Sequence, residues 1–191
     1  MAATLRAFIA MTIPEEIVAS LAGLQRSMRT KGLKIGWVRP ENIHLTLKFL
    51  GDISETAVPS VAGALGGAAC GLPPVSLSVR GMGVFPRIKR PRVLWAGLGG
   101  DIAGLRQLFG RVEAALEPIG WVPDRRGFKA HLTLGRIRKP IDGQQLTKVL
   151  SEVGGYAPIA FTTRRMVLYK SDLRPEGAAY TPLSEIFLTT E

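Results

Sequence analysis

The chain contains two histidines, and each begins the same tetrapeptide, His-Leu-Thr-Leu, at His44 and at His131. An imidazole near its unperturbed pKa of about 6.5 can hold or release a proton at neutral pH. If both rings face one reacting group, one can take a proton from water while the other protonates a leaving oxygen. Paired general acid-base catalysis is therefore the first chemistry that the sequence indicates.

The threonine of each tetrapeptide extends this interpretation. Side chains alternate along a β-strand, so His44 and Thr46 share one face, and His131 and Thr133 share another. The leucines between them then point into the core, and the threonine hydroxyls can donate hydrogen bonds to a tetrahedral anion. A single histidine on a strand is more often structural. Two matched motifs, with no third histidine in the chain, favour a functional pair that binds phosphate.

The chain also reads as a duplication. The offset that separates the two histidines carries Phe8 onto Trp95 and Leu21 onto Leu108. Each copy reads as strand, helix, His-Leu-Thr-Leu strand, helix, strand. The strands are expected at 6–11, 75–84, 93–98 and 159–169, and the later helices at 54–69 and 142–153. The copies, about 6–98 and 93–191, overlap, which predicts a single domain over 1–191 made of two interleaved lobes.

The pattern of elements predicts an α+β fold with pseudo-twofold symmetry. The first helix of each copy carries an apolar stripe, formed by Ile17, Leu21, Leu24 and Met28 and by Leu105, Leu108, Val112 and Leu116. A length of 191 residues with 46% hydrophobic residues is enough for one sizeable core. If the copies pack about the pseudo-twofold axis, both His-x-Thr faces line one central cleft.

The chain is strongly basic. Lysine and arginine number 25 against 15 acidic residues, which gives a net charge of +10. Much of the excess lies near the motifs or in predicted loops, at 87–92, 125–139 and 164–174. A basic surface of this kind favours a polyanionic partner, because binding releases condensed counterions. The alternative is solubilising charge on an arginine-rich sequence.

Residues 57–77 lack charged side chains but are not expected to span a membrane. The stretch contains Pro59, Pro73 and Pro74 with many small residues, which suits a short helix followed by a turn. The apolar run at 7–13 is too short for a signal peptide. We therefore expect a cytoplasmic protein with no membrane association. Cys70, the single cysteine, is expected to be a buried thiol without a catalytic role.

Five segments resemble a known family. They are RAFIAM (6–11), WVRPENIHLTLKFLGD (37–52), GVFPRIKRPRVLWAGL (83–98), FKAHLTLGRIR (128–138) and LYKSDLRPEGAAYTPL (168–183). On these segments the chain resembles the two-histidine phosphoesterase superfamily and, within it, the RNA 2′,3′-cyclic phosphodiesterases, also called 2′-5′ RNA ligases (LigT-like). Many members have proline before the second motif histidine, where this chain has Ala130.

The resemblance implies a bilobal fold with two antiparallel sheets, helices outside, and a cleft between them. It implies hydrolysis of a terminal RNA 2′,3′-cyclic phosphate to a 2′-phosphate, without metal or cofactor. By position, His44 would be the proton donor and His131 the proton acceptor, with Thr46 and Thr133 binding the phosphate. The implied partner is an RNA end, single-stranded or tRNA-like, and we expect a monomer. The two tetrapeptides are symmetric, so the residues themselves leave the direction of proton transfer open.

Two cations near the motifs are further candidates. Lys48 follows His44 by four residues and shares its face if the strand is regular, which makes it a possible RNA contact. Arg136 follows His131 by five residues and needs a bulge or a strand end to point into the cleft. We predict Arg136 as a third phosphate ligand.

Aromatic and basic neighbours could contact the rest of an RNA. Phe49, Phe85 and Tyr169 could stack on bases, although core packing is favoured for Phe49. The loop carrying Arg87, Lys89 and Arg90 could follow the RNA backbone, with solvated surface charge as the alternative.

Motifs for other enzyme classes are absent from the sequence. There is no GxxxxGK[ST] loop, no GxSxG elbow, no cysteine cluster and no histidine pair at metal-binding spacing on a helix. Two alternatives remain. One is 2′-5′ RNA ligation by the reverse reaction at the same site, and the other is a noncatalytic module that binds RNA ends.

Overall fold

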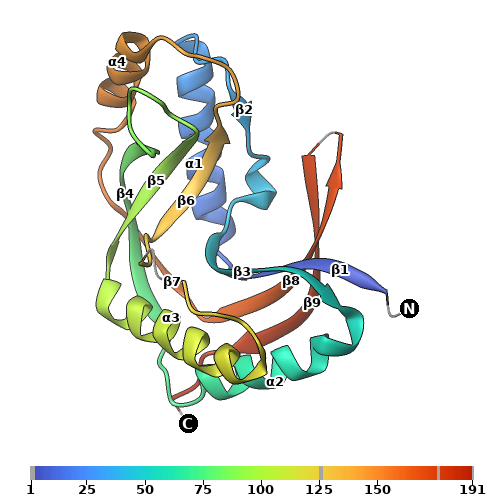
Figure 1. Cartoon of the computed structure of the whole chain (residues 1–191). Helices are drawn as coiled ribbons and strands as arrows, with labels where there is room; N and C mark the ends of the chain where they lie inside the picture. Colours follow the sequence, from blue (N-terminus) through green and yellow to red (C-terminus); the bar gives the residue numbers. More distant parts are fainter. Residues whose placement is uncertain (1–2, 125–126, 176, 191) are drawn as a thin grey trace.

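The computed structural model of the chain describes residues 3–124, 127–175 and 177–190. It has two lobes, each built on an antiparallel sheet (Figure 1). The lower sheet has the order β3 (Leu45–Ser54), β1 (Thr4–Met11), β8 (Arg165–Arg174), β9 (Gly177–Phe187). The upper sheet has the order β2 (Gly36–Trp37), β6 (His131–Arg136), β5 (Val93–Gly100), β4 (Val75–Phe85), β7 (Ile159–Thr163). The predicted α+β, bilobal class is confirmed.

Among the described residues, four α-helices cover the sheets from outside. The helices α1 (Glu15–Thr30) and α4 (Gly143–Val153) pack on the upper lobe, and α2 (Val58–Ala69) and α3 (Ile102–Leu116) pack on the lower lobe (Figure 1). The predicted apolar stripes face inward, except that Leu24 is only partly buried. Gln25 takes its place, and its amide Nε2 donates to the carbonyls of Val38 (2.8 Å) and Leu134 (2.9 Å). A buried polar group thus fixes α1 to the end of β6.

The strand order is interleaved. In the lower sheet, β3 and β1 come from the first predicted copy, and β1 pairs next with β8 from the second. In the upper sheet, β6 and β5 come from the second copy, and β5 pairs next with β4 from the first. Each sheet therefore contains strands from both copies, and neither lobe corresponds to one copy.

The prediction of a single strand at 159–169 is wrong. The chain forms β7 as far as Thr163, where it pairs with β4 of the upper sheet, and then β8 from Arg165, where it pairs with β1 of the lower sheet. The Thr163 hydroxyl donates to the carbonyl of Thr12 (2.9 Å) at the crossing point. Apolar residues continue through the crossing, because both strands face a core, so periodicity did not reveal the change of sheet.

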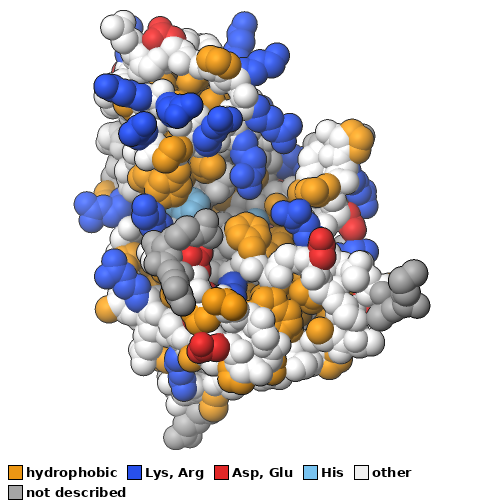
Figure 2. Space-filling model, viewed as in Figure 1, with side chains coloured by type: hydrophobic (Ala, Val, Ile, Leu, Met, Phe, Trp, Pro, Cys, Tyr) orange, Lys and Arg blue, Asp and Glu red, His pale blue; other side chains and the backbone are white. Residues whose placement is uncertain are grey.

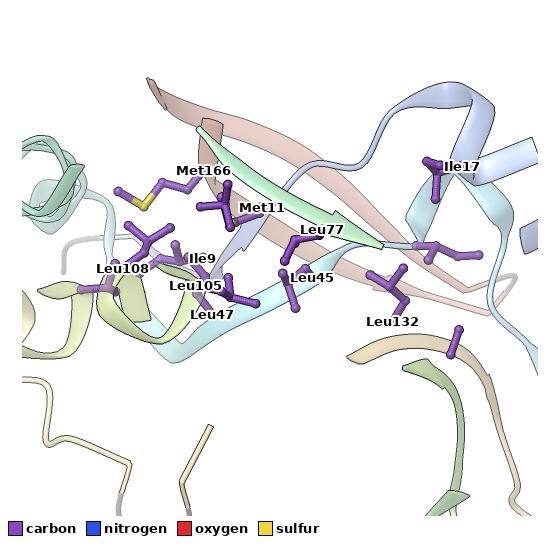
Figure 3. Close-up of a cluster of buried hydrophobic side chains, with 14 of the residues drawn as sticks. Ile9, Met11, Ile17, Leu45, Leu47, Leu77, Leu105, Leu108, Leu132 and Met166 are labelled. Atoms are coloured by element: carbon purple, nitrogen blue, oxygen red, sulfur yellow. The ribbon is translucent and has the colours of Figure 1, made fainter. Parts of the chain in front are cut away.

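The leucines of both tetrapeptides lie in the core. Figure 3 shows Leu45, Leu47 and Leu132 among buried side chains from β1 and α3. Leu134 is equally buried. Burying a leucine side chain contributes about 1.5 to 3 kcal/mol. The apolar half of each motif therefore fixes the polar half in position.

Two expectations about the 57–77 stretch are tested by the structure. In the part of the chain that the structure describes, no helix combines the length and apolar character needed to cross a membrane. The expectation of a buried Cys70 is wrong, because its side chain is exposed. It follows the last turn of α2, where the helical stripe that faces the core has ended.

Candidate active site

The two histidines lie in the hollow between the lobes. His44 directly precedes β3 of the lower sheet, and His131 is the first residue of β6 of the upper sheet. The two strands contact each other across the lobes. Figure 2 shows histidine side chains on the floor of the hollow. The rings are close enough for the charge of His131 to lower the pKa of His44, so segments distant in the sequence supply one site.

Both rings are held in the same way. His44 Nδ1 lies 2.8 Å from the carbonyl oxygen of Asn42, and His131 Nδ1 lies 2.6 Å from that of Lys129. A carbonyl only accepts, so each Nδ1 carries the proton and donates it. Each neutral ring then has its Nε2 lone pair available. The duplicated motif therefore fixes the tautomer as well as the position.

Burial makes both rings weak bases. Desolvation lowers the pKa of His44 to about 4, with the positive charges of Arg136 and His131 adding to it and the hydrogen bond to Asn42 opposing it. Desolvation and then Arg136 also lower the pKa of His131, against the hydrogen bond to Lys129. Without a bound anion, both imidazoles are therefore neutral at pH 7.

Aromatic rings enclose the histidines. The His44 ring lies 4.8 Å from Phe8 and 5.3 Å, edge on, from Tyr180. The His131 ring meets Phe85 edge on at 5.0 Å. These contacts supply the burial that lowers both pKa values, and they restrict rotation of the rings. Phe8 and Tyr180 were missed in the sequence, where nothing places a strand from each end of the chain beside His44.

Both motif strands carry the same irregularity. Leu47 has no partner on β1, and Leu134 has none on β5, where the register shifts by one residue. Such a bulge turns the following residues by one position. From each histidine onward, the six residues are half-buried, buried, half-buried, buried, buried and exposed. Arg136 and its counterpart Phe49 therefore return to the cleft face.

The predicted phosphate ligands occupy this face. Thr46 and Thr133 are half-buried, and across the described ranges neither hydroxyl has a hydrogen-bond partner. Arg136 is exposed, and it lowers the pKa of both histidines, so its charge acts on the whole site. The sequence indicated that Arg136 could point into the cleft only at a bulge or a strand end, and the bulge at Leu134 meets this requirement.

Lys48 does not lie on the face of His44. The bulge turns its side chain inward, where Nζ pairs with Glu113 Oε2 at 2.6 Å and donates to the carbonyl of Val122 at 3.0 Å. The prediction assumed that the strand is regular as far as Lys48, and this assumption is wrong. We therefore place Lys48 beside Glu113 rather than among the phosphate contacts.

The three candidate stacking residues differ in position. Phe49 is 63% exposed, so the interpretation that favoured core packing is wrong. Phe85 is half-buried beside His131 and lies under the Lys129 ammonium, 5.5 Å from its ring centre. Tyr169 stacks on Phe8 at 5.3 Å and supports the wall behind His44. Phe49 and Phe85 are thus the two rings next to open space.

Basic side chains surround the hollow. Figure 2 shows lysine and arginine side chains gathered over the upper lobe, above the histidines. Arg87, Lys89 and Arg90, in the loop between β4 and β5, are exposed.

Arg136, predicted from the sequence, lies beyond His44 in a group with three other arginines that were not predicted as site residues. Arg6, Arg136, Arg138 and Arg174 line a hollow of about 440 Å³ with Phe49 and Tyr180. Arg6 and Arg174 lie in the lower sheet, Arg136 ends β6 of the upper sheet and Arg138 follows it, so only the fold assembles them. None of the four guanidinium groups forms an ion pair with another described residue. Within the described ranges, no three metal-ligating side chains converge.

Sequence comparison places this chain in a family. The family described as "LigT like Phosphoesterase" matches residues 11–95 and 100–180. An RNA 2′,3′-cyclic phosphodiesterase of Aeropyrum pernix is 34% identical over 170 residues, covering 89% of this chain and 96% of the relative. Another from Thermotoga maritima is 31% identical, covering 95% and 94%.

Solved structures show the same architecture. The protein TT0787 of Thermus thermophilus is similar with a TM-score of 0.79 and 28% identity, covering 96% of this chain and 98% of that one. The E. coli LigT structure complexed with 3′-AMP gives a TM-score of 0.76 at 25% identity, covering 98% and 99%.

Proposed function

Because the chain belongs to the LigT-like phosphoesterase family, we propose that it hydrolyses a terminal RNA 2′,3′-cyclic phosphate to a 2′-phosphate, without a metal ion. The observation that carries this proposal is the matched pair of imidazoles in one cleft, each of which donates its Nδ1–H to a backbone carbonyl oxygen. That arrangement leaves two Nε2 atoms available for proton transfer to and from one phosphate.

The proposed reaction moves one proton at each ring. His131 Nε2 takes a proton from water as the water oxygen bonds to phosphorus. The bond from phosphorus to the 3′ oxygen breaks, and that oxygen takes a proton from His44 Nε2. The Thr46 and Thr133 hydroxyls and the Arg136 guanidinium stabilise the negative charge on the other phosphate oxygens. Each proton transfer contributes about 10² to 10⁴ in rate.

The donor role of His44 follows the family resemblance and requires a protonated ring. In the free protein, burial keeps the pKa of His44 at about 4. A bound phosphate anion stabilises the imidazolium and raises this pKa, so the substrate helps to protonate its own donor. In the free protein, the low pKa keeps His44 neutral, and a neutral imidazole could equally well act as the proton acceptor.

The basic surroundings support RNA as the substrate. The arginines that line the second hollow carry unpaired charge next to the proposed reaction centre. The exposed loop with Arg87, Lys89 and Arg90 extends positive charge over the upper lobe. An RNA chain placed at the histidines would therefore meet cations on both sides.

The first test is a short RNA that ends in a 2′,3′-cyclic phosphate. We expect a product with the phosphate on the 2′ oxygen, no change in rate with EDTA, and losses of at least about 10²-fold for His44→Ala and His131→Ala. A 3′-phosphate product would contradict the assignment of the leaving oxygen. Unchanged turnover in both variants would reject catalysis by the histidines and would support the alternative of a noncatalytic module that binds RNA ends. Adding a 5′-hydroxyl RNA would reveal ligation.

The second test assigns the two roles. In a substrate with sulfur in place of the 3′ oxygen, the leaving group needs no proton, because thiols are acidic, with a pKa of about 8.5. We expect this substrate to restore His44→Ala towards the wild-type rate but not His131→Ala. The reverse pattern would exchange the roles, and loss of rate in both variants would contradict general acid catalysis.

A further inference from the structure

A cavity of about 620 Å³ opens from the histidine site along the free edge of β3. His131 and Thr46 lie at the end that adjoins the proposed reaction centre. Its lining also contains the charged residues Asp124 and Lys129, and it is rich in aromatic side chains, namely Phe49, Phe85, Phe109, Phe128 and Trp121. The volume lies in the range of about 300 to 1,000 Å³ that is usual for small-molecule sites.

The same cavity contains a buried ion pair. Lys48 is 8% exposed and Glu113, on α3, is 6% exposed, and both line the cavity. Glu113 Oε2 accepts from Lys48 Nζ at 2.6 Å and from the backbone N–H of Asp124 at 3.1 Å. These two donors hold one oxygen of the carboxylate in place, and with it the orientation of the whole group.

The other oxygen, Glu113 Oε1, is buried without a hydrogen-bond partner among the described residues. An unpaired buried carboxylate oxygen is costly, and buried polar groups are nearly always satisfied. A carboxylate that is already held by a lysine can only accept hydrogen bonds. The cavity therefore combines aromatic side chains, suited to a flat ring, with a lining residue, Glu113, whose second carboxylate oxygen is buried in the wall and is not used by the protein.

We propose that the base of the terminal nucleotide enters this cavity, and that Glu113 Oε1 accepts a hydrogen bond from its exocyclic amino group. This inference rests on the proposed function, and it adds a preference for RNA ends that carry adenine or cytosine over those that carry uracil. A base with a carbonyl at the same position would place two acceptors against each other. Lys48 acts as a positioning residue that holds the carboxylate.

The test compares cyclic nucleotides that differ in one group, using the wild-type protein. Adenosine 2′,3′-cyclic phosphate has a 6-amino group, the inosine analogue has a 6-carbonyl, and the purine riboside analogue has neither. We expect kcat/KM for adenosine to exceed that for inosine by about tenfold or more, with purine riboside between them. Cytidine should exceed uridine in the same way.

Glu113→Gln gives a sharper prediction. Lys48 and the Asp124 N–H would hold the amide oxygen, so the amide NH2 would occupy the position of Oε1. A donor would then face the base, and the preference should reverse towards inosine and uridine. Glu117→Gln, four residues later and exposed, is the matched control and should retain the preference for adenosine. Purine riboside turnover corrects for any general loss of activity in Glu113→Gln.

Equal kcat/KM for adenosine, inosine and purine riboside in the wild-type protein would overturn this inference, while turnover of all three would still support the proposed function. If no cyclic phosphate is hydrolysed, the proposed function fails. The inference is then decided by equilibrium binding of adenosine and inosine 2′-phosphates, which requires no turnover. Equal dissociation constants would reject it. These comparisons need no variant, so they decide the question even if Glu113→Gln does not fold.

Discussion

At the scale of single residues, the site depends on how each histidine ring is held. The Nδ1 atoms donate to backbone carbonyls two residues upstream, so proton transfer is confined to Nε2. Burial and the charge of Arg136 lower both pKa values. The backbone carbonyls of Asn42 and Lys129 thus set which nitrogen of each ring is available for chemistry.

The lowered pKa values predict an acidic pH optimum for kcat/KM. The rate needs one neutral and one protonated ring in the free protein. Since both pKa values lie below 6.5, the protonated fraction declines as pH rises, and kcat/KM should fall by up to about tenfold per pH unit above that point. The profile of kcat should lie at higher pH, because the bound phosphate raises the pKa of the donor.

Arg136→Gln tests the cause of these shifts. Removing the guanidinium charge should raise both histidine pKa values and move the limbs of the kcat/KM profile to higher pH, whatever the overall loss of rate. Limbs that stay at the wild-type pH would show that this arginine does not act on the rings. The profiles are measured by steady-state kinetics over roughly pH 4 to 9, a range that includes the ordinary histidine pKa of about 6.5.

At the scale of elements, the bulge in each motif strand decides which side chains reach the cleft. The His-Leu-Thr-Leu spacing correctly predicted that the leucines face the core, because alternation holds up to Leu47 and Leu134. It failed for Lys48 and Phe49, which lie beyond the bulge. A bulge arises from the way two strands pair, so it cannot be recognised in the sequence of one strand alone.

Other misses have the same origin. The change of sheet at Arg164 depends on which partner strand is available, and both β7 and β8 present apolar residues to a core. Tyr180 and Glu113 reach the site through tertiary packing, from segments whose sequences resemble ordinary strand and helix. Local pattern and resemblance thus predicted the two histidines and their threonines as site residues, whereas the side chains that surround them could be seen only in the fold.

The position of Phe49 gives a prediction at this scale. Because its side chain is 63% exposed on the cleft face, Phe49→Ala should raise KM for the RNA several-fold while changing the free energy of unfolding by less than about 0.5 kcal/mol. Phe187→Ala, on β9 and 57% exposed, is the matched control and should leave KM unchanged. A loss of about 3 kcal/mol or more in stability would instead indicate a core residue. Chemical denaturation and kinetics provide the two readouts.

At the scale of the whole molecule, the cleft is continuous with two different spaces. The aromatic cavity lies along β3, and the arginine-lined hollow lies beyond His44 against β9. Residues of both lobes line each of them. The two histidines occupy equivalent positions in the two motifs, but the spaces next to them differ, since one is lined with aromatic rings and the other with arginines.

The arginine-lined hollow predicts a preference for substrates longer than one nucleotide. Arg6→Gln and Arg174→Gln should lower kcat/KM for a dinucleotide ending in a cyclic phosphate about tenfold more than for the mononucleotide, because they weaken a charge-assisted contact to the preceding phosphate. Arg106→Gln, on α3 and outside the hollow, should show no such difference. Equal effects on the two substrates would place the preceding phosphate elsewhere.

The matched bulges have a consequence for how a substrate lies in the site. They bring Phe49 to the cleft at one motif and Arg136 at the other, a flat apolar ring opposite a cation. A nucleotide has the same two ends, a base and a charged backbone. In the two possible orientations of a nucleotide between the imidazoles, its base and its backbone would meet different side chains, so the exchange of phenylalanine for arginine at matched positions favours one orientation over the other.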